Sequence, residues 1–70
     1  MLRVNFTIMV EATTKNEFAE LLNKFDIRVD RVEEFGDDYV IFDLGATRKA
    51  CDRLLDYLES EFDGIATLIQ

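Results

Sequence analysis

The chain has 70 residues, a formal net charge of −7, one cysteine and no histidine or tryptophan. This length allows a single domain, and a hydrophobic fraction of 49% is typical of a folded chain rather than a disordered one. Without histidine the chain lacks the usual neutral-pH general base and the commonest transition-metal ligand. We therefore expect no catalytic residues, no metal and no cofactor.

The location of the protein follows from the same composition. A single cysteine cannot form an internal disulfide, and it fits a reducing compartment. No apolar run approaches the ~18 residues of a membrane span, and the alternating start is not typical of a signal peptide. We expect a cytoplasmic protein with no membrane contact.

The net negative charge comes entirely from the second half of the sequence. Residues 1–32 hold five acidic and five basic side chains, whereas residues 33–70 hold ten acidic and three basic ones. Such a field disfavours direct binding to nucleic acid and favours binding to basic protein surfaces.

The first two elements have clear periodicities. Apolar and polar residues alternate over residues 2–11, which predicts a half-buried strand. Thr14 and Glu17 have the spacing of a capping box, with Thr14 as the N-cap of a helix. The apolar stripe of that helix consists of Phe18, Leu21, Leu22 and Phe25.

Two more strands follow, joined by a turn at Gly36. The apolar phase of residues 27–35 slips near Asp30 and Arg31, where a bulge would absorb the extra residue. Residues 38–45 are apolar on both faces, as a central strand should be.

A second helix and a short strand complete the chain. Thr47 is the expected N-cap, and residues 63–64 (Asp-Gly) are the expected stop. The inward side of this helix consists of Ala50, Cys51, Leu54, Leu55, Leu58 and Phe62. Residues 65–70 are the expected last strand.

The resulting order is β-α-β-β-α-β. Two right-handed βαβ crossovers joined by a hairpin predict an α+β, ferredoxin-like domain over residues 1–70. Its antiparallel sheet would have the strand order 4-1-3-2, with both helices on one face. This fold serves many unrelated functions and by itself specifies none.

The segment EEFGDDY, residues 33–39, gathers four carboxylates around Gly36 at the tip of the predicted hairpin. A solvated turn and an acidic patch for a basic partner both fit this composition. A metal site fits poorly, because the calcium spacing D-x-D-x-D-G is missing and neighbouring strand residues point to opposite faces. The acidic-patch residues at the tip are Glu33, Glu34, Asp37 and Asp38.

The second helix carries acids at its C-terminal end and bases in its first turn, which is the unfavourable orientation for the helix dipole. A sequence tuned only for stability would not have this arrangement, so it indicates a working surface. The exposed acids are Asp52, Asp56, Glu59, Glu61 and Asp63, of which Asp52, Asp56 and Glu59 form one ridge.

Two smaller features have ordinary structural explanations beside the functional ones. A loop over residues 44–49 offers an anion site at the helix start, built from Gly45, Thr47, Arg48 and Lys49; an ordinary capped helix start explains the same residues. Cys51 falls on the inward stripe, where a free thiol is expected to be a core residue.

The open face of the sheet and the edge formed by its last strand are two further candidate contact surfaces. The open face lacks the stacking aromatics of an RNA-recognition motif on its first strand, although Met9, Tyr39 and Ile41 there would suit a protein contact. The uncharged edge strand, residues 65–69 (Ile65–Ile69), is the expected edge for a homodimer.

The favoured hypothesis is a small, non-enzymatic interaction protein whose acidic second half docks on a basic surface of a partner, for example a nucleic-acid-binding protein. In charge and size the chain resembles phage-encoded inhibitors of host defence, including anti-CRISPR and anti-restriction proteins that mimic nucleic acid. The alternatives are a dimeric ACT-like regulatory module that binds a small ligand, and an accessory subunit of a larger assembly.

Overall fold

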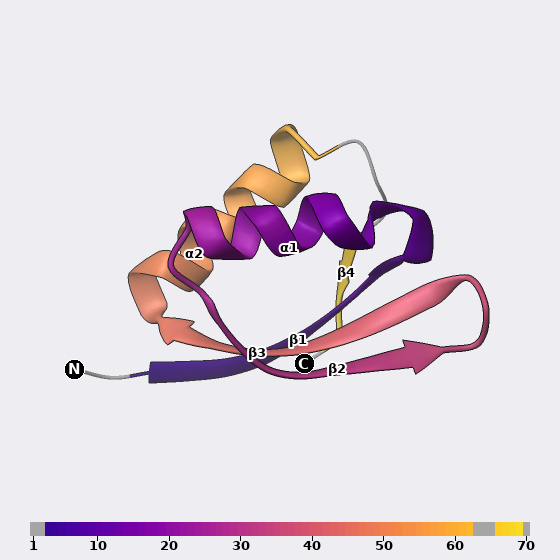
Figure 1. Cartoon of the computed structure of the whole chain (residues 1–70). Coiled ribbons are helices and arrows are strands. Elements are labelled where there is room, and N and C mark those ends of the chain that lie inside the picture. Colours follow the sequence, from indigo (N-terminus) through magenta and orange to yellow (C-terminus); the bar gives the residue numbers. More distant parts are fainter. Residues whose placement is uncertain (1–2, 63–65, 70) are drawn as a thin grey trace.

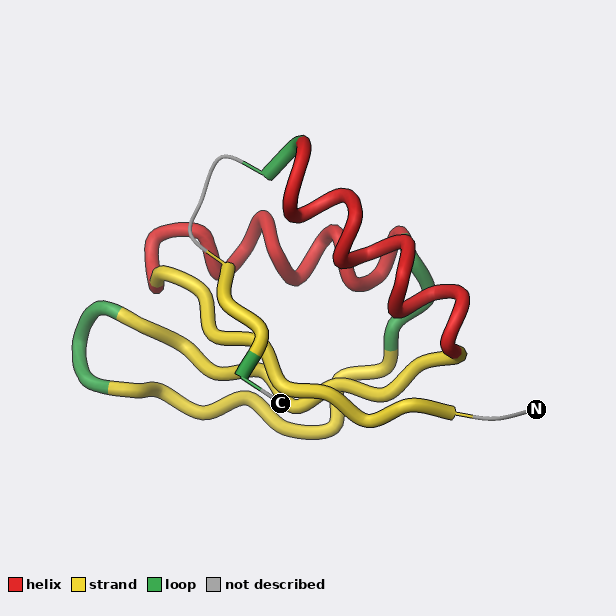
Figure 2. Tube along the Cα trace, turned by 180° about the vertical axis from the view of Figure 1, so that it is seen from behind, coloured by secondary structure: helices red, strands yellow, loops and turns green. Residues whose placement is uncertain are grey.

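The computed structural model describes residues 3–62 and 66–69, and it has the predicted βαββαβ order (Figure 1). The elements are β1 (Arg3–Glu11), a 3₁₀ turn (Ala12–Thr14), α1 (Lys15–Lys24), β2 (Arg28–Phe35), β3 (Tyr39–Thr47), α2 (Arg48–Ser60) and β4 (Ala66–Leu68). All strand pairs are antiparallel, and the sheet order β2-β3-β1-β4 is the predicted order read from the opposite edge. Both helices cover one face of the sheet (Figure 2), so the predicted ferredoxin-like fold is confirmed.

The core forms where the helices meet alternate residues of the two central strands. Val10 pairs with Val40 and Ile8 with Phe42, so their side chains share the face beneath the helices. Phe18 of α1 packs edge-on against Phe42, with ring centroids 4.9 Å apart. The buried hydrophobic residues are Phe6, Ile8, Val10, Phe18, Leu22, Ile27, Val40, Phe42, Leu44, Ala46, Cys51 and Leu54.

The start of α1 differs from the predicted capping box. The Thr14 hydroxyl donates to Glu11 O (2.8 Å) and caps no helix N–H group. This bond belongs to the 3₁₀ turn, which joins β1 to α1 without an extended N-cap residue. The capping box was therefore wrong, because Thr14 is engaged one turn earlier.

The end of α1 has a Schellman motif that the sequence pattern did not indicate. Asp26 has φ +59°, its N–H donates to Asn23 O (3.3 Å), and the Ile27 N–H donates to Leu22 O (2.8 Å). Ile27 and Leu22 are both buried, which supplies the apolar contact that accompanies this motif. Aspartate takes the position where glycine is usual.

The hairpin between β2 and β3 confirms two predictions. The register shifts between Val29 and Arg31, at the expected bulge, and Gly36 turns the chain with φ +67°. Figure 1 shows this hairpin reaching beyond the helices at the end where α1 begins. Every residue of β2 is exposed, because it is an edge strand and its outer half lies past the helical layer.

No loop separates β3 from α2, contrary to the expectation for residues 44–49. The strand runs to Thr47 and the helix begins at Arg48. The Thr47 hydroxyl accepts a hydrogen bond from the Ala50 N–H (3.2 Å), which confirms Thr47 as the N-cap. Thr47 has φ −67° and ψ 156°, which is an extended conformation. The same residue can therefore end the strand and cap the helix.

The last strand is short and lies at the edge beside β1. It pairs with Ile8, Met9 and Val10, and the Ile69 N–H extends the ladder by donating to Thr7 O (2.8 Å). The helix α2 ends at Ser60, before the expected stop at residues 63–64, so the predicted end was too late and Phe62 lies just past the helix. Residues 63–64 and the ends of the predicted strand, Ile65 and Gln70, lie outside the described residues. No helix in the described part of the chain combines the length and apolar character needed to cross a membrane.

Candidate partner-binding surfaces

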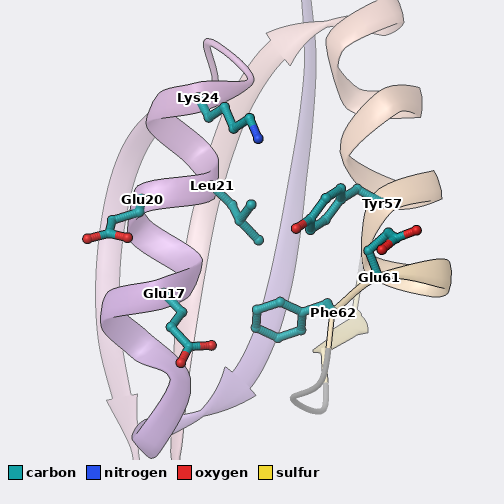
Figure 3. Close-up of a pocket in the computed structure, with 7 residues that line it drawn as sticks. All are labelled: Glu17, Glu20, Leu21, Lys24, Tyr57, Glu61 and Phe62. Atoms are coloured by element: carbon teal, nitrogen blue, oxygen red, sulfur yellow. The ribbon is translucent and has the colours of Figure 1, made fainter.

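A groove of about 360 Å³ runs between the outer sides of α1 and α2 (Figure 3). Leu21 from α1 and Tyr57 and Phe62 from the α2 end of the chain point toward one another across it. All three side chains are half-buried, so the groove has an apolar, mostly aromatic floor. The groove-lining residues are Glu17, Glu20, Leu21, Lys24, Tyr57, Glu61 and Phe62.

Aromatic contacts hold this floor in place. Phe62 packs edge-on against the buried Phe18, with ring centroids 6.1 Å apart, and Tyr57 packs against Phe25 at 5.5 Å. Edge-to-face packing of this kind fixes ring orientation as well as position. These contacts therefore hold the aromatic side chains of the floor in fixed positions.

The rim of the groove is acidic. Glu17 and Glu20 stand on α1 and Glu61 directly follows α2, against a single lining cation, Lys24, which extends toward Tyr57. Glu20 points outward, away from the floor (Figure 3). All four charged side chains are exposed, and the three salt bridges found among the described residues involve none of them.

An apolar floor with a carboxylate rim suits a long cationic side chain. The methylenes of a lysine or arginine can pack on Leu21 and Phe62 while the charged head reaches Glu17 or Glu61. The Tyr57 ring adds a face for a cation–π contact. Exposed ion pairs contribute only ~0.2–1 kcal/mol each, so the floor would provide most of the affinity and the rim the selectivity for a basic ligand.

Sequence reasoning found parts of this groove but not the groove itself. Glu61 was among the expected partner-binding acids, and Leu21 and Phe62 were assigned to the apolar stripes. The remaining lining residues, Glu17, Glu20, Lys24 and Tyr57, were not singled out for binding. The missing information is tertiary, because the groove exists only once two helices separated by a β-hairpin lie side by side. The one available signal was Tyr57, an aromatic residue beside the inward stripe.

The acidic hairpin tip is exposed, as expected for either a solvated turn or a docking patch. Glu33 pairs with Ile41 and Glu34 with Val40, so the two carboxylates point to opposite faces of the sheet. In the parts of the chain that the structure describes, no group of three or more acidic or cysteine side chains is placed to hold a metal ion.

The ridge of α2 is also exposed, but it lies apart from the groove. Helical spacing puts Asp52, Asp56 and Glu59 on the side of α2 turned away from Tyr57. The first turn of the helix contains no acid and the last turn no base, so the reversed charge pattern is present. Asp52 lies 3.9 Å from Arg48, an exposed pair one helical turn apart. Asp63 lies outside the described residues.

The expected anion site has a different geometry from the predicted loop. Gly45 is buried inside β3, where a Cβ would lie 3.1 Å from the Arg28 guanidinium. The Thr47 hydroxyl already accepts from the Ala50 N–H. Arg48 and Lys49 are exposed on the first turn of α2. Anion binding at these residues stays a prediction.

Cys51 is part of the core, as predicted. Its side chain is 6% exposed, and burial, with a smaller effect from the Asp52 carboxylate, raises its pKa above the ordinary thiol value, against a lowering effect of Arg48. A raised pKa keeps the sulfur as a neutral thiol, which is the opposite of what nucleophilic chemistry needs.

The chain matches no family model and no curated protein. Among solved structures it is similar to a protein from Thermus thermophilus that is designated a PII-like signaling protein. The two chains are 13% identical and superpose with a TM-score of 0.68, over 97% of this chain and 86% of the other. At this identity the likeness establishes the fold.

Proposed function

We propose that this protein is a non-enzymatic interaction module that binds a basic segment of a partner protein through the groove between α1 and α2. The observation that carries the proposal is the combination of a fixed aromatic and aliphatic floor with the Glu17 and Glu61 carboxylates at the rim. The net charge of −7 adds a long-range attraction toward basic partners, which raises the association rate more than the final affinity.

The other acidic surfaces have a secondary part in this proposal. The α2 ridge and the hairpin tip consist of exposed carboxylates, so they attract a basic surface without fixing its orientation. A nucleic-acid-binding protein is one class of partner that presents basic surfaces of the required kind. Inhibition of such a protein by an acidic decoy is one form that the proposed function can take.

The proposal is tested by capture from the lysate of the native host. Wild type is compared with Glu17→Lys/Glu61→Lys, which reverses the groove rim, and with Asp52→Lys/Asp56→Lys, which changes the net charge equally on the ridge. We expect the groove variant to lose a basic partner by about tenfold or more and the ridge variant to retain it at moderate salt. Equal losses in both variants would show that only net charge matters.

A regulatory signaling module is the second candidate, and the fold shared with the Thermus thermophilus protein favours it. In that case a small anionic ligand would bind at the start of α2, near Thr47, Arg48 and Lys49. A thermal-shift screen with nucleotides and small carboxylates separates the two candidates. A shift that Arg48→Ala/Lys49→Ala removes supports the regulator, whereas the interaction module predicts no shift with any of these ligands.

A further inference from the structure

The open face of the sheet, opposite the helices, carries an apolar cluster toward the hairpin end. Met9 pairs with Ile41, and Phe35 pairs with Tyr39, all on the face that the helices leave free. Phe35 is 58% exposed, and the other three side chains are half-buried. The Ile69 N–H bond to Thr7 O places Ile69 on the same face. An exposed cluster of large apolar side chains marks a contact surface.

The basic residues of this face gather at the end of the sheet away from the hairpin tip. Arg28 lies opposite Gly45 and Arg31 opposite Asp43, and Arg3 lies opposite Thr47. The carboxylates at the same end are Asp30 and Asp43, so three arginines face two acids there. This end has a small positive excess, although the chain as a whole is strongly negative.

The opposite end of the face is acidic. The turn beyond Phe35 carries Asp37 and Asp38, and Glu11 lies opposite Tyr39, the strand residue that adjoins the turn. Glu33, opposite Ile41, lies nearer the middle of the face. No lysine or arginine occurs in residues 32–42, which run from the middle of β2 through the turn to the middle of β3. The open face therefore has one basic and one acidic end.

Two internal ion pairs bear on how far the arginines can reach. Arg28 Nε lies 2.6 Å from an Asp30 oxygen, and an Arg31 nitrogen lies 3.5 Å from a Glu33 oxygen. All four side chains are more than a third exposed, and exposed pairs of this kind are weak. A guanidinium has five N–H donors, so each arginine can keep its internal partner and also contact a carboxylate of another molecule.

The middle of the apolar cluster lies at the level of Val40, between the Met9–Ile41 pair and the Phe35–Tyr39 pair. Arg31 is opposite Asp43, three residues from Val40 along β3, or about 10 Å at the strand rise per residue. Asp37 lies three residues from Val40 in the other direction, in the turn just beyond Tyr39. A two-fold axis that lies between two stacked open faces and crosses the strands at the level of Val40 therefore brings the basic end of one copy over the acidic turn of the other.

From this symmetry we propose that the open sheet face is the interface of a homodimer, with a second copy of this chain as its occupant. The two copies pack face to face around a shared apolar centre of Met9, Phe35, Tyr39 and Ile41. The arginines at the basic end of each copy meet the aspartates of the turn in the other. Packed sheets whose strands lie within about 30° of each other are a common arrangement, and an isologous contact needs this self-complementarity. The helical groove stays free for a basic ligand.

Sedimentation equilibrium of the full chain tests the apolar centre. We expect wild type to be a dimer at concentrations where Phe35→Glu is a monomer. Val32→Glu is the matched control, since Val32 lies on the same strand, is 43% exposed and faces the helix side opposite Phe42. The control should remain a dimer. A monomeric wild type, or equal behaviour of the two variants, overturns the proposal, and so does a larger assembly.

A pair of complementary variants tests the charge arrangement. Arg28→Glu/Arg31→Glu has two acidic ends, and Asp37→Lys/Asp38→Lys replaces both turn carboxylates with cations. Each should be monomeric alone, and the equimolar mixture should form a heterodimer. If mixing restores no dimer, or if either variant dimerises alone, the two-fold arrangement is wrong. A dimer that only Leu68→Glu disrupts would instead be an edge-to-edge contact through β4, and this result also overturns the proposal.

Discussion

At the scale of single residues, the backbone of Asp26 stands out. An L-residue at φ +59° is less stable than glycine there, although aspartate tolerates this conformation better than most residues. We expect Asp26→Gly to raise the free energy of unfolding by about 0.5–1 kcal/mol, measured by urea denaturation. Gly36→Ala, at φ +67°, should lower it by about 1 kcal/mol. If both changes shift stability in the same direction, the left-handed backbone is not their cause.

The Cys51 thiol gives the second residue-scale prediction. Its pKa is raised in the folded chain by burial, so the unfolded state ionises first as the pH rises. The neutral buried thiol therefore contributes fully to the free energy of unfolding below the ordinary thiol pKa. This contribution is lost as the pH rises through the pKa that Cys51 has in the folded state. Unfolding free energy should therefore fall more steeply above pH ~9 in wild type than in Cys51→Ala. Identical slopes would contradict the assignment.

At the scale of elements, α2 combines a sound N-cap with a reversed charge pattern. Glu59→Lys places a cation in the last turn and Lys49→Glu an acid in the first turn, and each should stabilise the protein by about 0.3–1 kcal/mol at low salt. The two substitutions move the net charge in opposite directions, so they control for each other. Thermal unfolding measures both gains, which should shrink in high salt. If only Glu59→Lys stabilises, the benefit comes from reduced net charge and not from the dipole.

The elements themselves were largely predictable because local signals agree. Alternation indicates β1, and apolar residues on both faces indicate β3. The phase slip at Asp30 indicates the bulge, and Thr47 has the right place for the cap of α2. The errors occurred where a residue has two competing partners or an unusual conformation. Thr14 bonds to the Glu11 carbonyl instead of a helix N–H, and Asp26 takes a position where glycine is the usual signal.

At the scale of the whole molecule, the candidate site was only partly predictable. Net charge and the acidic second half follow from composition, but Glu17 and Glu61 share a rim only through the placement of α1 beside α2. Periodicity assigns Leu21 and Phe62 to the core side of their helices, yet both side chains also line an external groove. Charge composition also gave no indication that the open sheet face has one basic and one acidic end.

The central claim is that the groove, and not the general negative field, recognises a basic segment. The most direct measurement is a ¹H–¹⁵N NMR titration of the chain with a synthetic amphipathic lysine-rich peptide, with a glutamate-for-lysine peptide as control. We predict saturable shifts centred on Glu17, Leu21, Tyr57 and Glu61, which persist at moderate salt because the floor contributes, and none with the acidic peptide. Shifts spread evenly over the groove, the α2 ridge and the hairpin tip, and lost together as salt rises, would contradict the claim.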